Sequence, residues 1–205
     1  MSMSIIGFAA IILVFFYSVI LHEIAHGFVA YRLGDPTAKL AGRLTLNPLK
    51  HVDPLGTIIL PAVLLFINSS IIFGWAKPVP INFMNLRHPK RDIMWVGISG
   101  PLTNILLAVL FSQFLRLDLA LPYIQIIKLA VTINLILAIF NLIPIPPLDG
   151  SRLVFSLLPS KYAYLYGRME NYGILIVLAL LYLGLLDRVV WPLVNIAGYY
   201  LGLGT

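Results

Sequence analysis

Six stretches of this 205-residue chain carry no charged side chain, and most of them approach the roughly 20 residues that a helix needs to cross a bilayer. Hydrophobic residues make up 60% of the sequence and charged residues only 11%, whereas a soluble domain has about 25% charged residues. This composition excludes an ordinary soluble globule and a disordered chain. We therefore expect an all-α polytopic membrane protein with apolar segments at 4–21, 54–76, 93–115, 129–148, 171–186 and 189–205.

The basic residues indicate how these segments are oriented. Eleven of the fourteen Lys and Arg residues lie in the segments 32–53, 74–92 and 144–170. Basic loops favour the cytoplasmic side, so we expect a multi-pass protein of the cell membrane with its N-terminus outside. The net charge of +6 then reflects membrane sidedness, and no nucleic-acid partner is expected. The first apolar run lacks a preceding basic residue and a signal-peptide cleavage pattern, which favours a retained span.

Segment 54–73 raises a problem of sidedness, because two basic segments flank it. A full crossing would place them on opposite sides. We therefore expect 54–73 to enter the membrane and return, with a plain span as the alternative. Pro54, Gly56 and Pro61 interrupt a helix here, and the partly alternating residues 40–46 suggest short strands at the membrane surface.

The first apolar segment continues into the sequence His22-Glu23-Ile24-Ala25-His26. On a helix, residues i and i+4 lie about 40° apart and about 6 Å along the axis, so both imidazoles can reach one metal ion. The adjacent Glu can then act on a water molecule that the metal activates. The alternative is a pair of satisfied polar residues facing a helix bundle, but ionisable groups inside a membrane favour a functional role.

A catalytic zinc ion takes three protein ligands, and no cysteine is present to supply the third. Asp149 is favoured, because it follows a span that returns to the side on which His26 lies. An ordinary turn position in Asp149-Gly150 is the alternative reading. The other candidates are His51, Asp53, His88 and Glu170.

Three motifs resemble those of the site-2 protease family of intramembrane zinc metalloproteases. They are the His22–His26 motif, Gly100-Pro101-Leu102-Thr103-Asn104, and the segment 141–150, which reads Asn-Leu-Ile-Pro-Ile-Pro-Pro-Leu-Asp-Gly. The resemblance covers about residues 5–155 and points to the short branch that lacks PDZ and CBS modules. It implies a core of the first, third and fourth apolar segments. Because the sequence has no repeat and no low-complexity tract, we expect a single membrane-embedded domain over 1–205, with C-terminal helices at about 171–205.

The resemblance also implies one Zn²⁺ on His22, His26 and Asp149, with Glu23 as the general base. The implied substrates are transmembrane helices, cut near or within the bilayer. The identity of any regulatory membrane partner stays open.

Two asparagines are candidates to stabilise the oxyanion of the reaction or to position the substrate. Asn141 is the first choice, because it precedes Asp149 by one or two turns, and Asn104 is the second. The alternative for each is an interhelical hydrogen bond. Pro144, Pro146 and Pro147 exclude a helix and favour an extended backbone, which could pair with an unwound substrate.

Two other classes of function fit the same residues. A metal-ion transporter or channel would use His22, His26 and Asp149 as a transient site, and an inactive scaffold would hold zinc for structure alone. Glu23 separates these classes, because only the peptidase requires its carboxylate for turnover.

Overall fold

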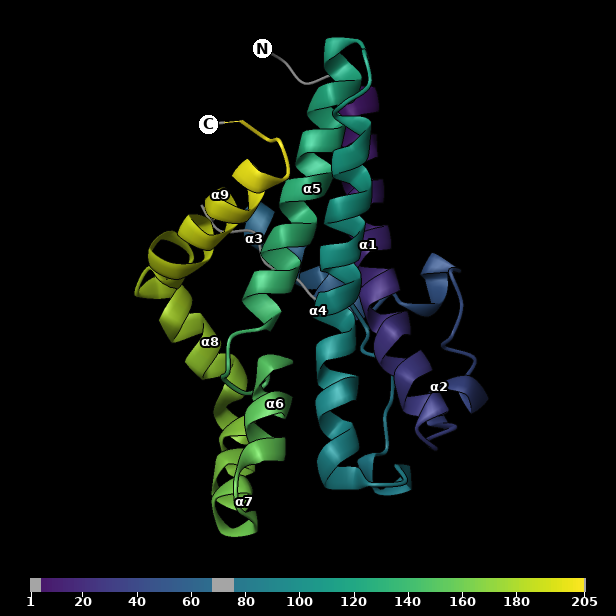
Figure 1. Ribbon diagram of the computed structural model, residues 1–205, viewed down its shortest axis with the longest axis vertical. Helices are drawn as coiled ribbons and strands as arrows, with labels where there is room; N and C mark the ends of the chain where they lie inside the picture. Colours follow the sequence, from purple (N-terminus) through teal and green to yellow (C-terminus); the bar gives the residue numbers. More distant parts are fainter. Residues whose placement is uncertain (1–4, 68–75, 205) are drawn as a thin grey trace.

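Three long helices form the centre of the protein, shown by a computed structural model that describes residues 5–67 and 76–204. They are α1 (Ile5–Arg32), α4 (Pro89–Phe114) and α5 (Leu121–Asn141), and Figure 1 shows them side by side. All three are long and apolar enough to cross a membrane. The predicted all-α membrane fold is confirmed, and so is the core of the first, third and fourth apolar segments.

Small and polar residues form the face by which α4 packs against its neighbours. Its buried residues include Gly97, Ser99, Gly100, Asn104 and Ala108. In a membrane the hydrophobic effect does not drive helices together, because lipid tails are as apolar as the side chains. Small side chains compensate by letting the helix backbones pack closely. α4 is therefore the central helix of the core, in contact with both α1 and α5.

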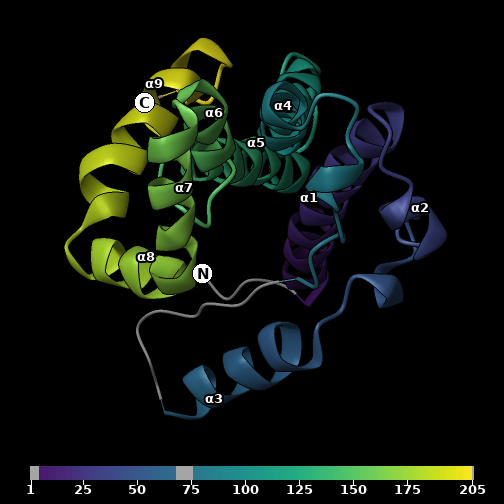
Figure 2. The ribbon, with the colours of Figure 1, turned by 90° about the horizontal axis from the view of Figure 1, so that it is seen from below.

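The connection from α1 to α4 contains only short helices in its described part. α2 (Thr37–Leu40) and η1 (Pro48–Lys50) follow α1, and η2 (Pro54–Ile59) continues into α3 (Leu60–Phe66). η3 (Phe83–Asn85) precedes α4. In Figure 2, α3 stands apart from the helix core.

The structure tests the expected insertion of 54–73 only in part. Residues 54–66 form one helical stretch of about 20 Å, too short to cross a hydrocarbon core of about 30 Å alone. Residues 68–73 lie outside the described residues, so a return of the chain there stays a prediction.

The predicted strands in 40–46 are wrong. Within the described chain these residues form a helix end, turns and bends. Their backbone hydrogen bonds are local, since the Gly42 and Arg43 amides donate to Lys39 and Ala38 carbonyls, and Gly42 adopts a φ of +63°. A backbone that is paired locally in this way cannot form a ladder with a second strand.

The C-terminal part is a chain of shorter helices. They are α6 (Gly150–Leu157), α7 (Ser160–Arg168), η4 (Met169–Tyr172), α8 (Gly173–Tyr182), η5 (Leu186–Val190) and α9 (Trp191–Tyr200). The helical stretches Ser160–Tyr182 and Leu186–Tyr200 meet at 70°, at a break that contains Gly184 with a φ of +85°. Asp187 and Arg188, which separate the apolar segments 171–186 and 189–205, lie within η5, so the chain changes direction before them.

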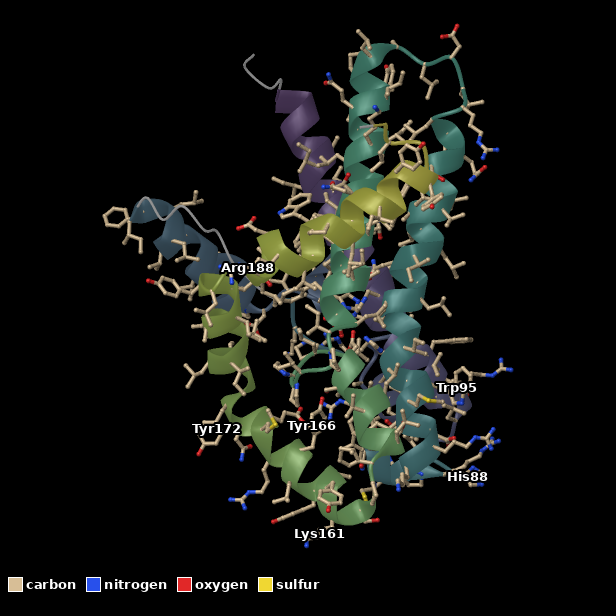
Figure 3. All side chains as sticks on the ribbon, turned by 60° about the vertical axis from the view of Figure 1, so that its left-hand side comes forward. His88, Trp95, Lys161, Tyr166, Tyr172 and Arg188 are labelled. Carbon is tan, nitrogen blue, oxygen red and sulfur yellow. The ribbon has the colours of Figure 1, made fainter. Side chains whose placement is uncertain are left out.

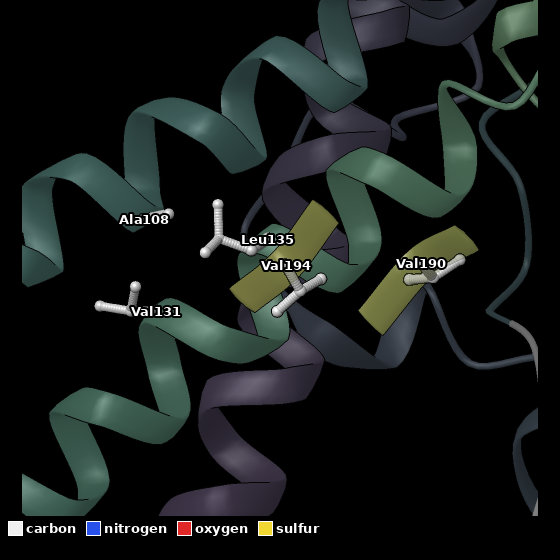
Figure 4. Close-up of a cluster of buried hydrophobic side chains, with 5 residues drawn as sticks. All are labelled: Ala108, Val131, Leu135, Val190 and Val194. Atoms are coloured by element: carbon white, nitrogen blue, oxygen red, sulfur yellow. The ribbon is translucent and has the colours of Figure 1, made fainter. Parts of the chain in front are cut away.

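Packing against α5 explains why the chain bends here. Val190 and Val194 of the C-terminal arm bury their side chains against Val131 and Leu135 of α5 and Ala108 of α4 (Figure 4). Glycine adopts a positive φ without a steric penalty, so Gly184 accommodates the change of direction. The bend therefore brings the last helix back onto the three-helix core.

Candidate metal centre

Two histidines of α1 and one aspartate that follows α5 in the chain meet at a single point. Nε2 of His22 lies 3.0 Å from Nε2 of His26. Oδ2 of Asp149 lies 3.0 Å from the first of these nitrogens and 3.2 Å from the second. Both imidazoles are buried. The predicted set of His22, His26 and Asp149 is thus brought together by helices that are distant in sequence.

The polypeptide around Asp149 turns sharply to deliver its carboxylate. α5 ends at Asn141, and α6 begins at Gly150, directly after Asp149. A Cβ atom on Gly150 would lie only 2.2 Å from the carbonyl oxygen of Leu142. The Asp-Gly pair therefore has a steric basis, because only glycine fits where the chain folds back on the end of α5.

The proline-containing segment before Asp149 is not extended as predicted. Residues 142–149 form turns and bends. Proline removes the backbone donors at three positions, and the Ile145 and Leu148 amides donate to the carbonyls of Ile143 and Ile145. Local turns therefore replace the open strand edge that the sequence suggested.

A glycine of α4 provides the space for both imidazoles. A Cβ atom on Gly100 would lie 2.4 Å from Nε2 of His26 and 2.6 Å from Nε2 of His22. Any larger side chain would occupy the position of the ring nitrogens. Gly100, the first residue of the Gly100–Asn104 motif, is therefore part of the metal centre.

The other ring nitrogen of each histidine faces a hydrogen-bond acceptor. Nδ1 of His22 lies 2.6 Å from Oδ1 of Asn104, and Nδ1 of His26 lies 2.6 Å from the carbonyl oxygen of Val96. A carbonyl oxygen can only accept, so each Nδ1 carries the proton. Each Nε2 is then left as a lone pair directed at the centre, the form in which imidazole binds metal.

Asn104 belongs to a buried polar network between the helices. Its Nδ2 donates to Oδ1 of Asn134 at 2.8 Å and to the carbonyl of Ser18 at 3.3 Å. Nδ2 of Asn134 in turn donates to Oγ of Ser18 at 2.9 Å. These contacts connect α1, α4 and α5 behind His22, so Asn104 makes the interhelical hydrogen bonds that were the alternative reading of its role.

The donor set fits a divalent cation. With both Nδ1 atoms protonated, two Nε2 lone pairs and a carboxylate oxygen converge with no proton between them, and Oδ2 of Asp149 is buried without a hydrogen-bond donor among the described residues. Tetrahedral ligands at about 2.0–2.1 Å from zinc lie about 3.3–3.4 Å from one another. The observed separations are close to this value, and two imidazoles with one carboxylate are a usual catalytic zinc set.

The other predicted site residues have local roles. Glu23 is half-buried beside the centre and accepts a hydrogen bond from the Val79 amide at 2.8 Å. Asn141 donates from Nδ2 to the Leu137 carbonyl at 2.9 Å, one turn back on its own helix. Its predicted oxyanion role stays a prediction.

The remaining ligand candidates lie outside the centre. His51 is fully buried and bonds through Nε2 to the Thr45 carbonyl, and Asp53 accepts from the Gly56 amide. His88 projects outward at the start of α4 (Figure 3), and Glu170 forms an ion pair with Arg152 at 2.7 Å.

Comparison with known proteins places the chain among peptidases. Residues 118–184 match the model of peptidase family M50. The chain is 39% identical over 187 residues to "Putative zinc metalloprotease YwhC" of Bacillus subtilis (strain 168), covering 85% of this chain and 81% of that protein. It is 31% identical over 189 residues to "Putative zinc metalloprotease Rip2" of Mycolicibacterium smegmatis, covering 86% of this chain and 68% of the relative.

A third relative is "Zinc metalloprotease MJ0392" of Methanocaldococcus jannaschii, with 29% identity over 202 residues, which cover 95% of this chain and 49% of that protein. No solved structure matches the chain. The similarity to YwhC extends over most of both chains. The chain therefore belongs to peptidase family M50, the site-2 protease family, and is a multi-pass membrane zinc metalloprotease.

Proposed function

We propose that this protein is an intramembrane endopeptidase that cuts transmembrane-helix substrates near the cytoplasmic side of the bilayer, with Glu23 as the general base. The observation that supports this best is the position of the His22–His26–Asp149 centre within the helix core. His26 lies six residues, or about 9 Å, before Arg32 at the basic end of α1. The scissile bond would then be met below the membrane surface, on the side of the basic loops.

His22, His26 and Asp149 would hold the zinc ion. When bound, zinc supplies Lewis-acid chemistry that activates water and polarises a carbonyl group. Glu23 follows His22 directly, and we assign it the transfer of the proton from water to the leaving amine. Asn141, which precedes Asp149 at the end of α5, is our candidate donor to the developing oxyanion.

A helical substrate must be unwound before attack, since its peptide groups are paired within the helix. The turns of 142–149 leave little free strand edge there. The Pro144 carbonyl, for example, accepts a hydrogen bond from the Tyr166 hydroxyl at 2.8 Å. We therefore assign the unwinding of the substrate to another part of the loops around the centre, and not to residues 142–149.

Substitution of Glu23 by Gln tests the assignment. The purified variant should bind one zinc ion per chain but lose cleavage of a co-reconstituted single-span membrane substrate by at least about 100-fold. Glu170→Gln is the matched control, because Glu170 is the other glutamate of the chain and pairs with Arg152. It should cleave at the wild-type rate.

Retained cleavage by Glu23→Gln would refute the general-base assignment. The alternative of a metal transporter predicts zinc flux into vesicles containing the protein and no product from the substrate. A scaffold predicts bound zinc with neither activity. Cleavage of a soluble unfolded peptide at the same rate as the membrane-embedded substrate would argue against an intramembrane site.

A further inference from the structure

An extended segment from the loop before α4 lies against the proposed general base. Residues 76–82, which we call the strap, have no helical or strand structure. The amide nitrogen of Val79, in the middle of the strap, lies 2.8 Å from Oε2 of Glu23, although the two residues are 56 positions apart. The strap therefore reaches the carboxylate through its backbone.

The prolines on both sides of Val79 make its amide the one donor available for the hydrogen bond to Glu23 at this point of the strap. Val79 lies between Pro78 and Pro80, and neither proline has a backbone N–H. A residue that precedes proline is restricted to extended conformations, which applies to Lys77 and Val79. The prolines thus stiffen the strap, and within Pro78–Pro80 the amide of Val79, which faces Glu23, is the only backbone N–H.

Hydrogen bonds to the backbone hold both ends of the strap. At its start, the Lys77 amide donates to the His51 carbonyl at 2.9 Å, and Nη2 of Arg43 donates to the Lys77 carbonyl at 2.6 Å. At its end, the Asn82 amide donates to Oδ2 of the buried Asp35 at 2.7 Å. The strap is therefore fixed on both sides of Val79.

The Val79 side chain is also seated on α1. A Cβ atom on Gly27 would lie 2.7 Å from Cγ1 of Val79, so the valine contacts the helix one turn after Glu23. Val79 itself is only 6% exposed. Oε1 of Glu23 takes no hydrogen bond from any described residue, so the second carboxylate oxygen can accept a proton.

We propose that the Val79 amide is a positioning group that orients Glu23, and that Arg43 and Asp35 hold the strap in place for it. The proposal rests on the general-base role of Glu23. One carboxylate oxygen is held by the strap, and the other is directed at the reacting water. Misplacement of a reacting group by about 1 Å costs about 100-fold in rate, so one such hydrogen bond can have a large effect on kcat.

The direct test removes the N–H and keeps the extended backbone. Val79→Pro should lower kcat about 10- to 100-fold, with KM changed less than about threefold and one zinc ion still bound per chain. Val79→Ala keeps the N–H and loses only part of the contact with Gly27. Its loss of kcat should be several times smaller. Equal losses in the two variants, or no loss in Val79→Pro, would overturn the proposal.

A second pair of variants covers the case in which Val79→Pro does not fold. Arg43→Met removes the donor to the Lys77 carbonyl, whereas Arg43→Lys keeps a cationic donor. Arg43→Met should lower kcat with zinc and KM retained, and Arg43→Lys should restore most of the rate. Equal rates in the two variants would contradict the proposed role of Arg43 in holding the strap.

These results are separate from the test of the proposed function. If Glu23→Gln still cleaves, the general-base assignment fails. If Glu23→Gln is inactive and Val79→Pro is not impaired, only the role of the strap fails.

Discussion

Oδ1 of Asn104 on α4 lies 2.6 Å from Nδ1 of His22 on α1, and both side chains are buried. This contact selects the ring nitrogen that is left for zinc. It also engages the Asn104 carbonyl, while the Asn104 amide hydrogens go to Asn134 and Ser18. We therefore expect Asn104 to act through His22, and not on the substrate.

Replacement of Asn104 by Leu should weaken zinc binding about 10- to 100-fold, because loss of such a partner frees the imidazole to rotate and change its tautomer. The measurement is the zinc dissociation constant from competition with a fluorescent chelator. Asn195→Leu, at an exposed position on α9, is the matched control and should bind zinc as the wild type does. An unchanged dissociation constant for Asn104→Leu would contradict this role.

Gly100→Ala should prevent zinc binding while leaving the helix intact. The added Cβ would lie 2.4–2.6 Å from the two metal-binding nitrogens, and the α4 backbone cannot retreat without disturbing its contacts with α1. Zinc per chain, measured by mass spectrometry of the purified protein, should fall close to zero. Gly167→Ala on α7 is the control, since its Cβ would be 3.5 Å from the Phe155 ring, an ordinary contact.

Asp149→Asn should reduce zinc affinity and cleavage together. An amide keeps the volume of the carboxylate but lacks its charge, and Oδ2 of Asp149 is the only oxygen of the predicted ligand set. Removal of zinc from the wild type with a chelator should abolish cleavage, and added zinc should restore it. Added zinc should restore Asp149→Asn only at much higher concentration, whereas the exposed Asp118→Asn should behave as the wild type.

Asp35→Asn should reveal a pH-dependent contribution to stability. Burial opposes ionisation of Asp35, but hydrogen bonds from Thr37, Asn85 and the Asn82 amide outweigh it and hold the pKa of the carboxyl below its usual value. A carboxyl whose pKa is lowered on folding stabilises the protein above the unfolded-state pKa of about 3.9. That contribution is lost as the pH falls through the lower, folded-state value.

At neutral pH the unfolding temperature of Asp35→Asn in detergent should therefore lie several degrees below that of the wild type. The two should converge in acid, below about pH 4. A difference that stays constant from pH 7 to pH 3 would show that the carboxylate is not the stabilising form.

Much of the core was predictable because its signals are local. Long charge-free runs identify α1, α4 and α5, since a bilayer requires about 20 apolar residues in sequence. The spacing of His22 and His26 predicts convergence on one ion, since one helix carries both. The sidedness of the spans was enough to favour Asp149, although it follows His26 by more than a hundred residues.

The periphery was predicted less well, because hydropathy alone does not show what a segment packs against. Residues 54–66 and 171–200 are mostly apolar, yet the first form a short helical stretch that stands apart from the core, and the second bend at Gly184 to pack on α5. At 40–46, local turns pair the backbone in place of the expected strands.

The amino-acid sequence by itself determined which atoms are available for zinc and which helices are long enough to bury them, because ligand chemistry and hydropathy are properties of the residues. The tertiary structure decided how each of those atoms is oriented. Nδ1 of His22 is hydrogen-bonded to Asn104, and Nδ1 of His26 to the Val96 carbonyl. Glu23 accepts a hydrogen bond from the Val79 amide. All three bonds form only when separate segments pack together. A hydrogen bond requires a partner within about 3 Å, and in this core that proximity is created by helix packing between residues far apart in the chain.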